Sequence, residues 1–132
     1  MKIDVHTHIL PENWPDLNSK YKTSGFAAID HHKPCCAKLM IGDKVFREIT
    51  DNSWDKSVRL EDCDKTGVNL QVLSTVPVMF NYWAKPEETY DLSRYLNDHI
   101  AQVVRDDPKR FAGLGTLPMQ DTKLAIKELE RC

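Results

Sequence analysis

The sequence has no apolar run that approaches the roughly 18 residues a membrane-spanning helix requires. It also has no excess of one charge, because 18 basic and 20 acidic side chains leave a formal net charge of −2. This balance gives no reason to expect a nucleic acid or a membrane surface as a partner. The N-terminus carries no apolar stretch typical of a signal peptide. We therefore expect a cytosolic protein that binds neither nucleic acid nor membrane.

Cysteines are few and form no CxxC motif, which argues against a zinc knuckle and a dithiol redox motif. They are Cys35, Cys36, Cys63 and Cys132. Adjacent residues do not easily form a disulfide with each other, and the cytosol keeps thiols reduced. We predict four free thiols. Binding of a soft metal by the Cys35–Cys36 pair is the alternative.

Glycine is also scarce, at 5 of 132 residues, and no glycine-rich phosphate loop follows the first predicted strand. This argues against a dinucleotide-binding fold. Instead, strand patterns alternate with helix patterns, each bounded by proline, glycine or a capping residue. The first predicted elements are a strand over 2–9, an irregular loop over 11–37 with room for one short helix, and two strands around a turn at Gly42-Asp43. A helix over 54–66 and a strand over 68–76 are predicted next. The last elements are a helix from Pro86 to just before Pro108, a strand over 110–117 and a helix from Asp121 onward.

Strands that alternate with helices predict a parallel sheet with right-handed crossovers. The apolar character of 68–76 and 110–117 further suggests strands buried on both faces. About three βα units match three-eighths of a (β/α)8 TIM barrel, which typically needs about 250 residues. We predict an α/β fold in which residues 1–132 form the N-terminal part of such a barrel. A small β-hairpin insertion, within roughly 11–53, follows the first strand.

Two histidines stand at i and i+2 near the C-terminal end of the first predicted strand. His6 and His8 therefore point to one face, where two imidazoles can share a divalent cation. Active sites of TIM barrels lie at this end of the strands. Asp4 is expected on the same face, deeper in the barrel, where it packs or forms hydrogen bonds rather than binding metal. An exposed edge strand would produce the same histidine pattern by chance, but the βα context favours a metal site.

The three other histidines lack such a position. His99 falls on the apolar face of a predicted helix, where a core or boundary role is the simpler interpretation. His31 and His32 lie in a polar segment and are expected at the surface. None of them is predicted to bind metal.

Several segments together resemble a known family, the amidohydrolase-related decarboxylases of the amidohydrolase superfamily. The segments that carry the broad resemblance are Asp4–Pro11, Arg59–Thr75 and Arg110–Gln120. Within the family, Lys44–Arg47, Asn52–Asp55 and Ser74–Pro86 are similar to members that act on an aminocarboxymuconate semialdehyde. The resemblance covers nearly the whole chain, and its clearest gaps lie between Asn18 and Cys36.

The resemblance implies a zinc-dependent, non-oxidative decarboxylase of tryptophan (kynurenine) catabolism that diverts the precursor of quinolinate and NAD. His6 and His8 match the first two zinc ligands. Arg47 matches an arginine that binds a substrate carboxylate, a role suited to its fork of donors. The family's other ligands and its catalytic histidine come from later strands, so this chain holds no catalytic residue and is expected to be inactive alone. The full-length relatives are expected to be cytosolic homodimers.

Two other interpretations remain open. The chain could belong to a different decarboxylase, of the benzoate type, or to a hydrolase of the same superfamily. It could also be a truncated product without catalysis that binds a full-length subunit.

Overall fold

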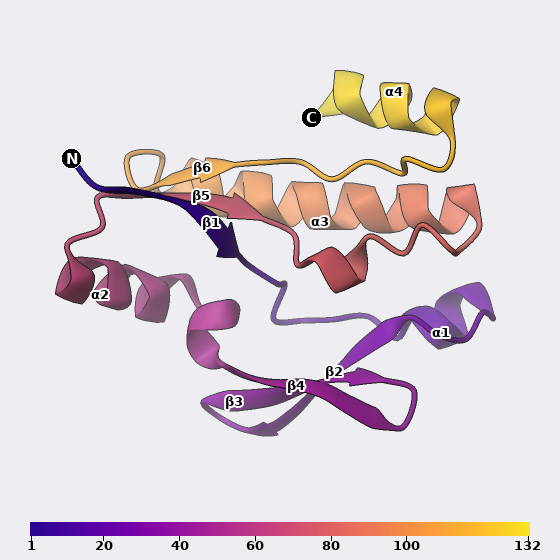
Figure 1. Cartoon of the computed structure of the whole chain (residues 1–132), viewed down its shortest axis with the longest axis horizontal. Helices are drawn as coiled ribbons and strands as arrows, with labels where there is room; N and C mark the ends of the chain where they lie inside the picture. Colours follow the sequence, from indigo (N-terminus) through magenta and orange to yellow (C-terminus); the bar gives the residue numbers. More distant parts are fainter.

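The computed structural model describes all residues, 1–132, and contains two three-stranded sheets and four α-helices (Figure 1). In chain order the elements are β1 (Ile3–His8), α1 (Leu17–Tyr21), β2 (Ala27–Lys33), β3 (Cys36–Ile41), β4 (Lys44–Thr50), α2 (Lys56–Thr66), β5 (Leu70–Ser74), α3 (Pro86–Asp106), β6 (Phe111–Gly113) and α4 (Thr122–Arg131). Short 3₁₀ turns follow β4 and β5. No helix is both long enough and apolar enough to cross a membrane.

The first sheet confirms the predicted βα order, because β1, β5 and β6 pair in parallel and in that order. Helix α3 runs along this sheet (Figure 1). Leu73 of β5 and Phe111 of β6 are buried in one cluster with Ile100 of α3. Only this face is covered: Val5 of β1 is 70% exposed and most of β5 is half-buried. The prediction of strands buried on both faces was wrong, because helices lie against one side alone.

The helix boundaries follow the capping residues that the sequence contains. Asp55 begins α2 by accepting hydrogen bonds from the backbone N–H groups of Ser57 and Val58. Gly67 ends it in the left-handed conformation, with φ of 68°, which glycine adopts without strain. Asp121 caps α4 in the same way as Asp55 caps α2. The end of α2 at Thr66 and the Asp121 cap of α4 are confirmed, whereas α2 begins at Lys56, two residues after the predicted start.

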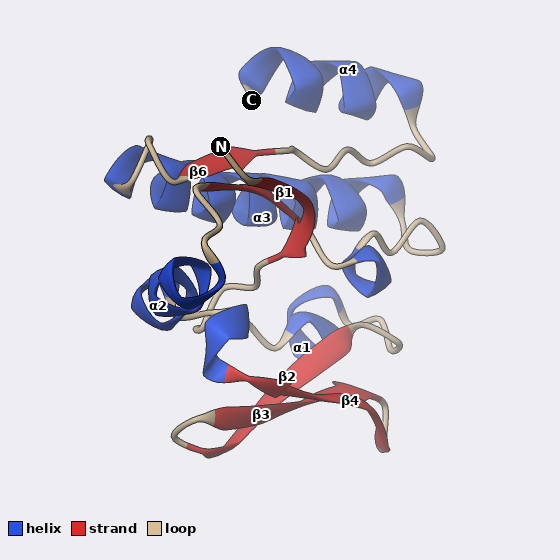
Figure 2. Cartoon of the chain, turned by 60° about the vertical axis from the view of Figure 1, so that its left-hand side comes forward, coloured by secondary structure: helices blue, strands red, loops and turns tan.

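The insertion between β1 and α2 holds more structure than predicted. The strands β3 and β4 and the Gly42 turn are present as expected, but β2 adds a third antiparallel strand where a loop was predicted. Its sequence ends in the polar run His31–Lys33, which hides the strand period. Pairing with β3, including Asp30 opposite Lys38, holds β2 in place. The insertion sheet lies at the opposite end of the molecule from α4 (Figure 2).

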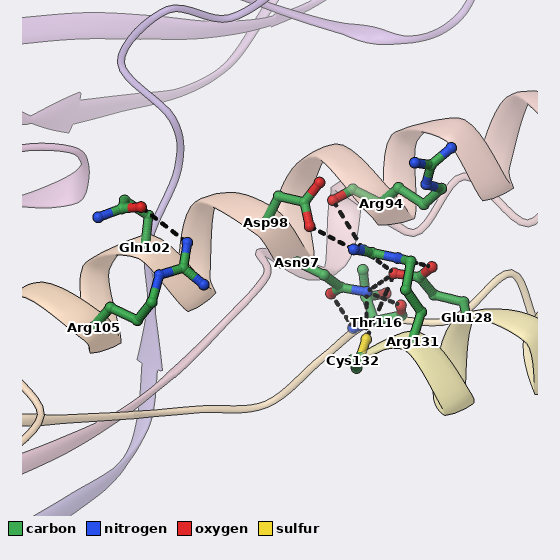
Figure 3. Close-up of polar contacts among 9 residues, drawn as sticks. All are labelled: Arg94, Asn97, Asp98, Gln102, Arg105, Thr116, Glu128, Arg131 and Cys132. Atoms are coloured by element: carbon green, nitrogen blue, oxygen red, sulfur yellow. Dashed lines mark hydrogen bonds and ion pairs between the residues drawn. The ribbon is translucent and has the colours of Figure 1, made fainter.

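The strand β6 is shorter than the predicted 110–117, because only three of its residues pair with β5. Beyond β6, the backbone of Thr116 bonds to a side chain instead. The Asn97 amide of α3 donates to the Thr116 carbonyl at 2.9 Å, and its oxygen accepts from the Thr116 N–H at 2.7 Å. The same amide donates to Glu128 Oε1 of α4 at 2.7 Å (Figure 3). A single buried side chain therefore ties α3 to both the loop and α4.

Glu128 is 0% exposed, and its charge is balanced inside this cluster. Burial alone would raise the pKa of the Glu128 carboxyl, but hydrogen bonds from Arg131 and Asn97 outweigh it and hold the pKa below its ordinary value. Arg131 also contacts Asp98 of α3 at 2.6 Å (Figure 3). We name Asn97, Thr116, Glu128 and Arg131 the α3–α4 polar cluster.

The structure leaves all four cysteines as free thiols. The Sγ atoms of Cys35 and Cys36 lie 3.1 Å apart at the turn between β2 and β3. This turn is on the insertion sheet rather than on the parallel sheet that carries the histidine pair.

Candidate metal and substrate site

The histidine pair lies at the C-terminal end of β1. The rings of His6 and His8 have centroids 5.2 Å apart and meet edge to face, so they lie on the same side of the strand. His8 pairs with Ser74 of β5, one residue beyond Leu73, whose side chain faces α3. Because successive strand residues point to opposite faces, His8 is on the face of the sheet away from α3.

Asp4 does not share that face, contrary to the prediction. Asp4 pairs with Gln71, whereas Thr7 pairs with Leu73. Between these two pairs β1 advances by three residues and β5 by only two, so β1 contains one extra residue. This β-bulge reverses the alternation between Asp4 and His8. The Asp4 carboxylate consequently lies on the helix side, where it accepts a hydrogen bond from Gln71 Nε2 at 3.3 Å. The expected role of Asp4 in hydrogen bonding rather than metal binding agrees with this contact.

A residue that the sequence reasoning missed holds the end of β1 in place. Arg59 of α2 is only 8% exposed, and its Nη2 donates to the backbone carbonyl of His8 at 2.6 Å. Its Nη1 donates to Gln71 Oε1 at 3.2 Å, which links Arg59 to Asp4 through Gln71. In the sequence, the only indication of this role is that Arg59 lies in the first turns of a helix that has to pack against the sheet.

The His8 ring itself contacts β5. Its Nδ1 lies 3.0 Å from Ser74 Oγ, and the same hydroxyl lies 2.9 Å from the Thr7 carbonyl. Burial lowers the pKa of His8 and the charge of His6 lowers it further, whereas a backbone hydrogen bond with Thr75 opposes part of this shift. The lowered pKa favours the neutral imidazole, which is the form that binds metals.

Arg47 lies on β4, apart from the histidine pair. It is directly opposite the buried Leu39 of β3, so both side chains are on the same face of the insertion sheet. Ile49, two residues further along β4, packs against the core from that face. Arg47 thus faces the body of the protein while its side chain stays exposed, and no ion pair of the chain involves it. The structure does not bring Arg47 into contact with His6 or His8.

The donor set fits part of a metal site. Two neighbouring imidazoles at a strand end are suitable ligands for a divalent transition metal, and one of them is already oriented by a hydrogen bond. No group of three or more His, Cys, Asp or Glu side chains in the chain could hold a metal ion. A catalytic zinc site takes three protein ligands. The histidine pair could therefore serve as two ligands of such a site only together with other donors.

The other histidines lie elsewhere, as predicted. His99 is on α3, and burial lowers its pKa. His31 and His32 are exposed on β2, and the His31 ring packs edge-on against Trp54, with centroids 4.8 Å apart. The His99 ring hydrogen-bonds to the backbone of Leu10, two residues beyond β1, whereas His31 bonds to the carbonyl of Glu12.

Comparison with known proteins identifies relatives along the whole chain. The sequence is 60% identical over 132 residues to the 2-amino-3-carboxymuconate-6-semialdehyde decarboxylase of Dictyostelium discoideum, covering all of this chain and 37% of that protein. It is 42% identical over 126 residues to the Caenorhabditis elegans enzyme of the same name, covering 96% of this chain and 31% of that protein. The chain thus spans about a third of the length of these relatives. No protein-family model matches it.

Solved structures of decarboxylases share the fold of this chain. The 5-carboxyvanillate decarboxylase of Sphingomonas paucimobilis superimposes with a TM-score of 0.70 at 26% identity, over 98% of this chain and 38% of that one. A dihydroxybenzoic acid decarboxylase from Polaromonas, solved with bound manganese and the inhibitor 2-nitroresorcinol, gives a TM-score of 0.62 at 27% identity, over 99% and 34%. The predicted start of a (β/α)8 barrel is confirmed. Along nearly its whole length the chain is therefore similar to about a third of the 2-amino-3-carboxymuconate-6-semialdehyde decarboxylases, and it shares its fold with the matching third of these solved decarboxylases.

Proposed function

We propose that the chain forms the N-terminal part of a zinc-dependent enzyme that removes carbon dioxide from 2-amino-3-carboxymuconate 6-semialdehyde without oxidation. The observation that supports this most directly is the 60% identity, over the whole chain, to a relative named for that reaction. The histidine pair at the end of β1 adds a structural reason, because it presents two metal ligands on one side of the strand.

In this proposal His6 and His8 hold the metal, and Ser74 and Arg59 hold His8. A bound divalent metal would supply Lewis acidity and would lower the pKa of water in the site to about 7. The Polaromonas decarboxylase holds manganese, which supports a divalent metal in the family. The choice of zinc rests on the resemblance and on the preference of zinc for imidazole nitrogen.

Arg47 is proposed to bind a carboxylate of the substrate. Its guanidinium is exposed on the face of β4 that is turned toward the body of the protein, and no carboxylate of the chain occupies it. An unpaired guanidinium can accept a substrate carboxylate with two parallel hydrogen bonds. The β-bulge between Leu39 and Met40 pairs Leu39 with Arg47 and so sets this orientation.

The biological setting follows from the same resemblance. We propose a role in tryptophan (kynurenine) catabolism, where the reaction draws substrate away from quinolinate and NAD synthesis. We also propose a cytosolic location and a homodimeric complete enzyme.

A second candidate substrate class is a hydroxylated benzoate. The gamma-resorcylate decarboxylase of a Polaromonas strain is 38% identical over 117 residues, covering 83% of this chain and 35% of that protein. This relative makes another decarboxylase the stronger alternative and a hydrolase the weaker one. A non-catalytic chain that binds a full-length subunit is the third possibility, and it is supported by the presence of only two metal ligands.

A chimaera separates these possibilities. This chain would replace the matching third of the Dictyostelium discoideum relative, and release of carbon dioxide would be measured from the muconate semialdehyde and from gamma-resorcylate. We expect turnover of the semialdehyde, bound zinc by elemental analysis, and no turnover by the isolated chain. Preference for gamma-resorcylate would support the benzoate class. A folded chimaera inactive on both substrates would support the non-catalytic interpretation.

Arg47→Ala in the chimaera is expected to lower kcat/KM by about 10- to 100-fold, because a hydrogen bond to a charged group is worth roughly 1.5–3 kcal/mol. Arg47→Lys should restore little activity, since an ammonium cannot form the paired contact. Lys38→Ala, on the neighbouring strand β3, is the control for a lost surface cation. Steady-state kinetics that match the unmodified chimaera would remove Arg47 from the site.

A further inference from the structure

The Ser74 hydroxyl joins two groups at the end of β1. Ser74 is the last residue of β5 and pairs with His8 on the face away from α3. Its Oγ donates to the carbonyl of Thr7 at 2.9 Å and lies 3.0 Å from Nδ1 of His8. Ser74 is the side chain that hydrogen-bonds to the His8 ring, and the backbone of Thr75 is the other polar group that faces the ring.

The number of hydrogens available decides which atom donates in the hydrogen bond between Ser74 Oγ and His8 Nδ1. A serine hydroxyl has one hydrogen and otherwise accepts, whereas a backbone carbonyl only accepts. Because the hydrogen of Ser74 goes to Thr7, the bond to His8 requires the hydrogen of the ring. A neutral imidazole carries one N–H, so Nδ1 holds the proton and Nε2 keeps the free electron pair.

We propose that Ser74 is a positioning residue that fixes His8 in the Nδ1–H tautomer and so keeps Nε2 available as the metal ligand. A ring nitrogen binds a metal only through its free electron pair, and the other nitrogen of a ligating histidine commonly donates a hydrogen bond. Only this metal step rests on the proposed function. The tautomer itself is inferred from the assignment of the Ser74 hydrogen to the Thr7 carbonyl.

Two hydrogen bonds with different residues position His8. Arg59 holds the backbone carbonyl of His8, whereas Ser74 holds its ring. His6 serves as a comparison within the same chain. Its ring lies beside that of His8, but no hydrogen bond holds the His6 ring. We expect the His6 ring to exchange between both tautomers and the His8 ring to occupy one.

The tautomer can be measured directly by long-range ¹H–¹⁵N NMR correlations on the ¹⁵N-labelled chain, at a pH where both rings are neutral. We expect the pattern of an Nδ1–H ring for His8 and an averaged pattern for His6. An Nε2–H pattern for His8 would overturn the proposal without any mutation.

Variants then test the consequence for metal binding. Ser74→Ala is expected to give His8 an averaged pattern in the chain and to weaken Zn²⁺ binding by the metal-free chimaera, measured by titration calorimetry, by about 10- to 100-fold. Ser74→Thr keeps the hydroxyl and should retain both properties, whereas Ser57→Ala, at the exposed start of α2, is the matched control. An unchanged tautomer and affinity in Ser74→Ala would overturn the role of Ser74. If His8 is Nδ1–H but no chimaera binds Zn²⁺, the assignment of the tautomer stands and the proposed metal site fails.

Discussion

Replacing His8 with alanine in the chimaeric enzyme is expected to remove the metal and reduce decarboxylation to below about 1% of the unmodified rate. The reason is the small number of ligands: loss of a hydrogen bond behind a ligand already costs 10- to 100-fold in affinity or activity, so loss of the ligand itself costs more. Added zinc should not restore turnover, because the missing imidazole comes from β1 and no third ligand group exists in this chain to replace it.

The measurement combines elemental analysis of the purified protein with kinetics at increasing zinc concentration. His6→Ala should behave in the same way, because the His6 ring lies beside the His8 ring on the same side of β1. His32→Ala, an exposed histidine of β2, is the matched control and should leave metal content and rate unchanged. Stoichiometric metal and normal turnover in His8→Ala would show that β1 does not carry the metal site.

Asn97→Ala is expected to lower the free energy of unfolding by about 3 kcal/mol or more. The substitution removes the side chain that bonds the Thr116 N–H, the Thr116 carbonyl and Glu128 in the α3–α4 polar cluster (Figure 3). Each buried polar group left without a partner costs about 1–3 kcal/mol, and a charged one costs more. Glu128 is fully buried, so water cannot replace the lost donor cheaply.

Denaturant titration followed by circular dichroism would measure this loss in the 132-residue chain. Gln102→Ala serves as the control, because Gln102 lies on the same helix but bonds to Asp106 at the surface, and it should change stability by less than about 0.5 kcal/mol. Equal midpoints for Asn97→Ala and the unmodified chain would mean that α4 is not held by these hydrogen bonds.

The sequence predicted those features that depend on neighbouring residues. The Asp121 cap of α4, the end of α2 at Gly67, the proline at the start of α3 and the Gly42 turn are decided within a few residues, and all were found where expected. The pairing of the His6 and His8 rings also follows from their spacing of two along a strand.

Features decided by distant residues were missed or misplaced. The position of Asp4 depends on a bulge that only pairing with β5 reveals. The strand β2 exists because β3 pairs with it, although its own sequence is polar. The role of Arg59 depends on the packing of α2 beneath the end of β1, which no local pattern encodes. The positions of Arg47 and the histidine pair in one site remain a prediction.

The pairing of β1 with β5 also sets an order of events during synthesis. Ile3 pairs with Leu70, 67 residues later, whereas β2, β3 and β4 meet across short turns. At about 5–20 residues per second, the ribosome needs roughly 3–13 s to make the partner of β1 after β1 itself. The insertion sheet has time to form in that interval, since hairpins close in about 1–10 μs. The strand with the two histidines is made before its partner, so the sheet that holds the two imidazole rings side by side can form only after β5 has been synthesised.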